Sequence, residues 1–166
     1  TATFDQVMRW HLGGRTIRSI RTPGHSIDGT SYLVEDARVL IAGDAIATGI
    51  VPALNDGDGR TLEMSHRLLL EMTEEEISVL IPGHGPVVRD DAVADCLVWG
   101  AEYLRAVRQR LREQLMSGIE AEEALLASCP YDEFVGERYD RERHGMPRRH
   151  EAAATKMISE ERTRIP

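Results

Sequence analysis

The spacing of apolar residues along the chain changes near residue 90 and divides it into two parts. Between residues 15 and 90, apolar residues form short runs separated by turns that contain Gly and Pro, which is typical of strands. From residue 91 onward they recur at steps of three and four, the period of an amphipathic helix. The pattern predicts strands at Arg15–Thr22, Thr30–Val34, Val39–Ala42 and Val79–Ile81.

Two features predict how these strands are arranged. Glu35 and Asp36 lie between the second and third strands, and Asp favours turn geometry, so a hairpin is expected there. The run Val39–Ala42 is apolar without alternation, which is typical of a strand covered on both faces. We therefore expect a sheet with layers on both sides.

The helical part has one dominant element. Apolar residues from Val93 to Leu115 predict a helix over Asp91–Met116, capped by Asp90 or Asp91 and ended by Gly118. The other expected helices are Leu62–Met72 with Thr61 as its cap, Glu120–Ser128 stopped by Pro130, and His150–Arg162, with a loop over Tyr131–His150.

Length and charge narrow the classes of function. The chain has 166 residues, which suggests one domain, and its 20 Lys and Arg against 28 Asp and Glu give a net charge of −8. This acidity argues against a nucleic-acid partner, because phosphate binding is dominated by Lys and Arg. No apolar run approaches the ~20 residues of a membrane span, and no signal peptide is evident. Cys96 and Cys129 form no recognisable pair, so a cytoplasmic location is expected.

Three short segments each place a metal-binding side chain just after a predicted strand. They are Thr22-Pro23-Gly24-His25, Gly43-Asp44 and Pro82-Gly83-His84-Gly85. In layered α/β folds, sites gather at the carboxyl ends of strands, and a Gly beside the ligand permits a sharp turn. Imidazole nitrogens suit Zn²⁺, and the carboxylate of Asp44 can bridge two ions.

This combination resembles the metallo-β-lactamase-fold superfamily. The matching stretches are TPGHSIDGTSYL (22–33), VLIAGDAI (39–46) and LIPGHGPVV (80–88). The resemblance extends over roughly residues 12 to 162 and implies an αββα sandwich of two sheets with helices outside. It identifies 1–166 as a single incomplete domain of α/β (α+β) class, in which strand-rich residues 1–90 carry the motifs and residues 91–166 are helical.

The resemblance covers only half of that fold. The family's amino-terminal half carries an HxHxDH motif that supplies four metal ligands, and this sequence has none, since His11 is followed by Leu-Gly-Gly. The implied fragment is the carboxy-terminal half of a metallohydrolase. In it His25 would bind the first metal, Asp44 would bridge two metals and His84 would bind the second.

What the complete fold implies is a two-metal hydrolase. A hydroxide held between two Zn²⁺ ions, or Fe or Mn²⁺ ions, would attack an ester, thioester, lactone or similar small molecule, with Asp44 as the catalytic carboxylate. The alternative is a non-catalytic half-domain that pairs with itself, with another chain or with the missing half. No feature of the sequence names the substrate.

Other polar residues carry weaker signals with more than one interpretation. Asp28 suits either a turn or an acceptor for a ligand imidazole. His66 is expected to be a surface or packing residue, and His144 and His150 lie where they reach the site only if the tail folds back. Asn55–Gly59 is similar to a Ca²⁺ loop but lacks the Glu at its twelfth position, so a flexible loop at the mouth of the site is expected there, and residues 48–60 are the local candidate for setting specificity.

Overall fold

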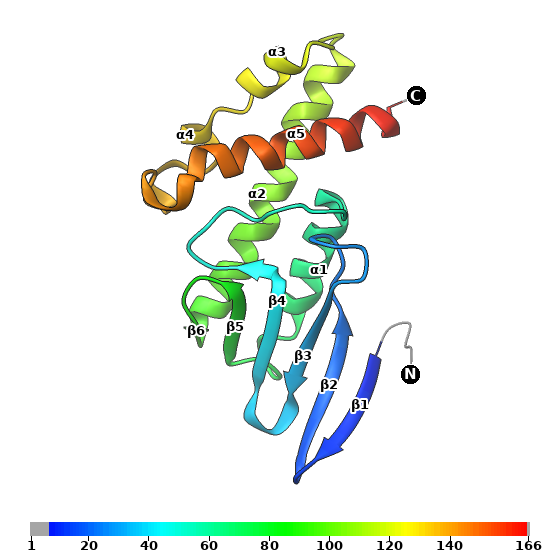
Figure 1. Cartoon of the computed structure of the whole chain (residues 1–166), viewed down its shortest axis with the longest axis vertical. Helices are drawn as coiled ribbons and strands as arrows, with labels where there is room; N and C mark the ends of the chain where they lie inside the picture. Colours follow the sequence, from blue (N-terminus) through cyan, green and yellow to red (C-terminus); the bar gives the residue numbers. More distant parts are fainter. Residues whose placement is uncertain (1–6, 166) are drawn as a thin grey trace.

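The computed structural model of the protein describes residues 7–165 and contains one mixed sheet followed by helices (Figure 1). Its six strands follow one another in chain order across the sheet. Every neighbouring pair is antiparallel except β4 and β5, which are parallel and joined through α1. The strands are β1 (Val7–Leu12), β2 (Arg15–Arg21), β3 (Thr30–Val34), β4 (Val39–Ala47), β5 (Val79–His84) and β6 (Val88–Arg89). The predicted α/β class with a mixed sheet is confirmed.

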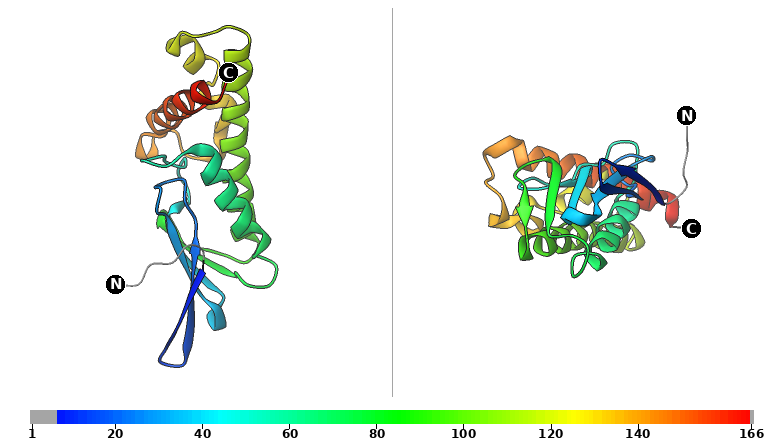
Figure 2. Two further views of the ribbon diagram at one scale, coloured as in Figure 1. Left: turned by 90° about the vertical axis from the view of Figure 1, so that its right-hand side faces the viewer. Right: turned by 90° about the horizontal axis from the view of Figure 1, so that it is seen from below.

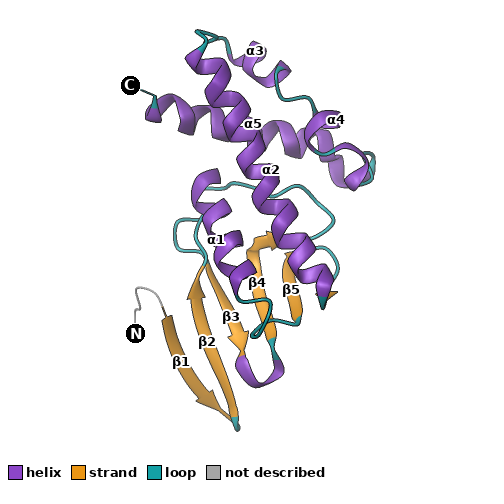
Figure 3. Ribbon diagram, turned by 180° about the vertical axis from the view of Figure 1, so that it is seen from behind, coloured by secondary structure: helices purple, strands orange, loops and turns teal. Residues whose placement is uncertain are grey.

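The helices gather in the second half of the chain, except for α1 (Figure 3). None of the helices within residues 7–165 combines the length and the hydropathy needed to cross a membrane. The helices are α1 (Gly59–Glu71), α2 (Asp91–Met116), α3 (Glu122–Ala127), α4 (Tyr131–Phe134) and α5 (Met146–Arg164), with 3₁₀ turns at Glu35–Ala37, Gly136–Arg138 and Arg143–Gly145.

The cap predicted for α1 is wrong. The helix begins at Gly59, three residues before Leu62, and its N-cap is Asp58. The Asp58 carboxylate accepts hydrogen bonds from the Thr61 amide at 2.9 Å and from the Thr61 hydroxyl at 2.6 Å, so Thr61 is the capped residue. Burial alone would raise the pKa of Asp58, but the bonds from Thr61 and the nearby Arg164 together lower it.

The long helix α2 has the predicted bounds, and its N-cap is Asp90, one of the two predicted residues. The Asp90 side chain makes no capping hydrogen bond. At the other end Gly118 follows the helix with a positive φ of 90°, as expected of a helix stop.

Several other strands and helices have bounds that differ from the predicted ones, because the apolar pattern does not mark their ends. β1 and β6 were not predicted, and β4 and β5 run past the predicted ends at Ala42 and Ile81. The expected loop 131–150 contains α4, two 3₁₀ turns and the first turn of α5, which begins before Pro147. Proline is favoured in the first turn of a helix, where its missing N–H costs nothing.

Only one face of the sheet is covered by other elements among residues 7–165. α1 and α2 lie on one side of it (Figure 2). On that side Leu40 and Leu80 are fully buried against Leu97. On the other side Tyr32, Ile41 and Ile81 lie next to one another in register and are 41%, 43% and 36% exposed. The prediction that Val39–Ala42 is covered on both faces is therefore wrong for the described chain. Val39–Ala42 is apolar on both sides, but the described residues cover only the side that faces α1 and α2.

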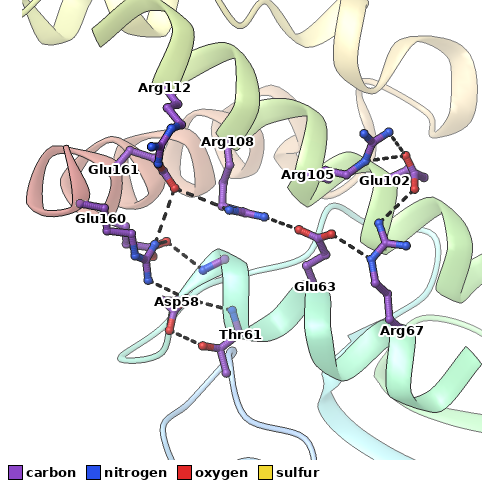
Figure 4. A network of polar contacts seen from close by, with 12 residues as sticks. Asp58, Thr61, Glu63, Arg67, Glu102, Arg105, Arg108, Arg112, Glu160 and Glu161 are labelled. Carbon is purple, nitrogen blue, oxygen red and sulfur yellow. Dashed lines mark hydrogen bonds and ion pairs between the residues drawn. The ribbon is translucent and has the colours of Figure 1, made fainter. Parts of the chain in front are cut away.

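α2 connects the sheet to a separate helical layer. Its 26 residues span roughly 39 Å at ~1.5 Å per residue, so its second half extends beyond the sheet. There Leu104, Val107 and Leu111 pack against α3, α4 and α5 in a second core cluster. A network of ion pairs also ties α5 to α1 and α2, with Arg108 between Glu63 and Glu161 (Figure 4).

Candidate metal centre

The three predicted ligands converge at one edge of the sheet. His25 lies in the bend after β2, Asp44 lies in β4, and His84 ends β5. His25 Nε2 is 3.8 Å from Asp44 Oδ2, and His84 Nε2 is 3.4 Å from Asp44 Oδ1. Each carboxylate oxygen therefore faces a different imidazole, which is the arrangement a bridging carboxylate needs.

An irregularity in β4 accommodates Asp44. Gly43 pairs with Pro82 and Ala47 pairs with His84, so three residues of β4 lie opposite the single residue Gly83. A side chain at Gly83 would place its Cβ 2.0 Å from Asp44 Oδ1. The carboxylate thus occupies space that exists only because position 83 is glycine.

The loop between β4 and α1 orients His25. The ring Nδ1 lies 3.0 Å from the carbonyl oxygen of Ala53, which fits a donated N–H, and the Asn55 amide donates to the His25 carbonyl at 2.8 Å. In a neutral imidazole this bond leaves Nε2, the atom facing Asp44, as the unprotonated nitrogen. Within the predicted flexible loop Asn55–Gly59, the Asn55 amide is anchored to the His25 bend and Asp58 caps α1.

Thr48 holds the loop that carries His84. Its amide donates to the His84 carbonyl at 2.9 Å, and its hydroxyl donates to the Pro86 carbonyl at 2.6 Å. Gly85 has a φ of 95°, and a Cβ there would lie 1.8 Å from the Thr48 carbonyl oxygen. The end of β4 and the PGHG turn therefore pack directly on each other.

The site opens into a polar pocket of 390 Å³, within the range of small-molecule sites. Its lining includes His25, Ser26, Asp28, Asp44 and Asn55. Asp28 accepts a hydrogen bond from the Ser26 hydroxyl at 3.1 Å, and the partner found for the His25 ring is Ala53. This supports the turn interpretation of Asp28. A larger groove of 660 Å³ between β2 and α1 has a mainly apolar lining that includes Met64 and Leu68.

The donor set fits part of a metal site. Two ligands of one tetrahedral zinc ion, each ~2.1 Å from it, lie roughly 3.4 Å apart, which matches the separation of His84 Nε2 and Asp44 Oδ1. Within residues 7–165, however, no group of three or more His, Cys, Asp or Glu side chains is placed to hold a metal ion. The three candidate ligands offer two imidazoles and one carboxylate, so a two-metal site would need further ligands.

Two of the remaining histidines are buried and lie outside the set of candidate ligands. His150 Nε2 lies 2.7 Å from the Cys129 carbonyl oxygen and its Nδ1 3.0 Å from the Tyr103 hydroxyl, so the helical layer holds its ring. Burial lowers the pKa of His150. His66 is 1% exposed and lies between α1, α2 and β4, which agrees with a packing residue. His144 lies in a 3₁₀ turn with a φ of 57°.

The buried His66 predicts a dependence of stability on pH. Burial lowers the pKa of His66 from 6.5 to about 4, so the unfolded chain binds this proton first as the pH falls. The free energy of unfolding should therefore decrease by about 3 kcal/mol between pH 6.5 and pH 4 through this group. Urea unfolding at several pH values measures the slope.

His66→Gln should flatten this slope, whereas His11→Gln, which changes an exposed imidazole in β1, should leave it unchanged. Equal slopes in the wild type and the His66→Gln variant would contradict the assignment.

The three candidate ligands lie inside one segment of the chain that matches a known family. Residues 10–84 match the Metallo-beta-lactamase superfamily, and this range contains His25, Asp44 and His84. Over 79 residues the chain is 35% identical to "Probable metallo-hydrolase YqgX" of Bacillus subtilis (strain 168), covering 46% of this chain and 36% of that protein. Over 161 residues it is 24% identical to "Lactamase-like protein adaB" of Aspergillus niger, covering 92% of this chain and 46% of that protein. The chain thus spans less than half the length of these two curated relatives.

Solved structures share the fold. The metallo-beta-lactamase family protein TTHA1429 from Thermus thermophilus superposes with a TM-score of 0.63 at 20% identity, covering 97% of this chain and 48% of that one. The sec-alkylsulfatase Pisa1 from Pseudomonas sp. gives a TM-score of 0.70 at 12% identity, covering 95% of this chain and 26% of that one. At these identities the likeness concerns the fold alone.

Proposed function

Because this chain carries a segment of the metallo-β-lactamase superfamily, we propose that it is the carboxy-terminal half of a two-metal hydrolase acting on an ester, thioester, lactone or similar small molecule. The observation that carries the proposal is the convergence of His25 and His84 on the two oxygens of Asp44. Three observations support the assignment to the carboxy-terminal half. They are the lack of an HxHxDH motif, the open face of the sheet and the partial coverage of the relatives.

The chain's residues would act mainly by holding and orienting the site. His25 and His84 would each present Nε2 to one ion, and Asp44 would hold both ions through its two oxygens. Bound zinc ions supply a Lewis acid and a hydroxide at neutral pH, since they lower the pKa of coordinated water toward ~7. The Ala53 carbonyl holds the proton of His25 on Nδ1, so Nε2 is available as a ligand. The leaving group would receive its proton from bound water or from the Asp44 carboxylate.

The test is metal analysis of the full-length gene product. We expect about two Zn²⁺, Fe or Mn²⁺ ions per chain, as a two-metal site requires. His84→Ala should remove one ion and the hydrolytic activity, with little change in stability because His84 is 65% exposed. A full-length protein that contains no metal and binds none would overturn the proposal.

The second candidate is a non-catalytic half-domain that pairs with another copy or another chain. The observation that favours it is the open sheet face, where Tyr32, Ile41 and Ile81 form a continuous apolar row. Apolar patches of more than a few hundred Å² are unusual on monomers and mark interaction surfaces.

This candidate predicts that the 166-residue chain is a dimer in light scattering and not an 18.6 kDa monomer. Ile41→Lys, on the open face, should make it monomeric, because pairing would bury an unpaired charge. Met64→Lys changes a more exposed apolar residue on the helical side and should leave the dimer intact. A wild-type monomer would count against pairing with itself.

A further inference from the structure

A buried imidazole lies directly behind the irregular part of β4 that carries Asp44. His66, on α1, is 1% exposed, and its Nε2 lies 3.0 Å from the carbonyl oxygen of Ala45, the residue after Asp44. A neutral imidazole fits this contact by donating its Nε2–H to the carbonyl. The low pKa of His66, about 4, keeps the ring neutral in the folded protein at physiological pH.

The Ala45 carbonyl requires a partner from outside the sheet. Asp44, Ala45 and Ile46 lie opposite the single residue Gly83, so regular pairing between β4 and β5 is interrupted here. Ala45 is 6% exposed, and a buried carbonyl without a hydrogen bond costs ~1–3 kcal/mol. The imidazole of His66 therefore gives the Ala45 carbonyl its hydrogen bond. It does so at the irregularity of β4 that turns Asp44 toward His25 and His84.

The ring of His66 is tightly confined. Gly100 of α2 lies against it, and a Cβ at that position would be 2.3 Å from both Nδ1 and Cε1. The neighbouring Ser65 donates its hydroxyl to the Pro23 carbonyl at 2.7 Å, two residues before His25. One turn of α1 thus contacts the backbone at Pro23, before His25, and at Ala45, after Asp44.

We propose that His66 is a positioning residue for the metal centre, acting through the Ala45 carbonyl to hold the Asp44 carboxylate between His25 and His84. This inference rests on the proposed function, since it assigns Asp44 to a metal site. It goes beyond that function by giving a role in the site to a residue of the helix layer that is not itself a ligand.

The experiment compares His66→Leu with His66→Gln in the full-length protein. Glutamine keeps an N–H donor near the position of Nε2, whereas leucine fills the space without one. Leu70→Ala, a partly buried change on the same helix, is the matched control for packing. The readouts are Co²⁺ affinity with the d–d spectrum of the bound ion, and, without metal, the NMR side-chain rotamer of Asp44.

We expect His66→Leu to weaken Co²⁺ binding by about 10-fold and to make the Asp44 rotamer average between states, since residues behind metal ligands typically contribute 10- to 100-fold in affinity. His66→Gln should keep the Co²⁺ affinity and the Asp44 rotamer close to those of the wild type. Leu70→Ala should lower the melting temperature and leave the affinity and the rotamer unchanged. Unchanged affinity and rotamer in His66→Leu would overturn the proposal, as would equal losses in Leu70→Ala. If the wild type binds no Co²⁺, the proposed function fails, and the metal-free rotamer still decides the role of His66.

Discussion

Replacing Asp44 with Asn in the full-length protein is expected to lower metal affinity and kcat/KM by at least ~100-fold, because loss of even an outer-shell partner of a metal ligand costs 10- to 100-fold. Asp44 faces both His25 and His84, so its loss affects both proposed ions. The amide has nearly the same shape but lacks the charge that two cations require. Isothermal titration with Zn²⁺ and steady-state kinetics measure the two effects.

The stability of the Asp44→Asn variant should change little, since the Asp44 side chain is 46% exposed. Asp36→Asn removes the same charge from the β3–β4 turn and is the matched control. It should bind and hydrolyse like the wild type. If the Asp44 and Asp36 variants behave alike, the carboxylate at position 44 is not a metal ligand and the proposed function loses its central residue.

Replacing Arg108 with Ala is expected to lower the free energy of unfolding by about 3 kcal/mol. Arg108 pairs with Glu63 of α1 and lies 3.6 Å from Glu161 of α5, and these side chains are only 10% and 2% exposed (Figure 4). Removing the guanidinium leaves two buried carboxylates with fewer partners. The loss lies at the lower end of the usual range because Arg112 and Arg164 also approach Glu161.

The matched control is Arg105→Ala, one turn earlier on the same helix. Arg105 pairs with Glu102 at the surface, where both side chains are about half exposed, and such pairs contribute less than ~1 kcal/mol. Chemical denaturation of the two variants measures the difference. Equal losses would show that the buried network contributes no more than a surface pair does.

Some parts of the fold could be predicted because their signals are local. The bounds of α2 follow from an apolar period that persists from Val93 to Leu111, and the β3–β4 connection follows from Glu35 and Asp36. The start of α1 was misplaced because Asp58 caps it from within a loop rich in Asp and Gly. In such a loop several residues have the chemistry of a cap, and only the backbone geometry selects one.

The sequence predicts the candidate ligands of the site but not the residues that orient them. The three candidate ligands have a sequence signal, since each follows a predicted strand and lies beside a glycine. The residues that orient them have none: Ala53 acts through a carbonyl that any residue possesses, and His66 and Thr48 lie in no recognisable motif. Contacts through backbone atoms depend on how distant segments pack, so residue type does not predict them.

Local pattern and side-chain chemistry were sufficient to predict the strand and helix classes and His25, Asp44 and His84 as candidate ligands, and the acidic charge follows from composition. The fold was needed to show that these three side chains meet, that α1 contacts the carbonyl after Asp44, and that the described helices cover one face of the sheet. These features arise from contacts between residues far apart in the chain. Such contacts follow from register, bulges and packing, which the periodicity of a single segment does not encode.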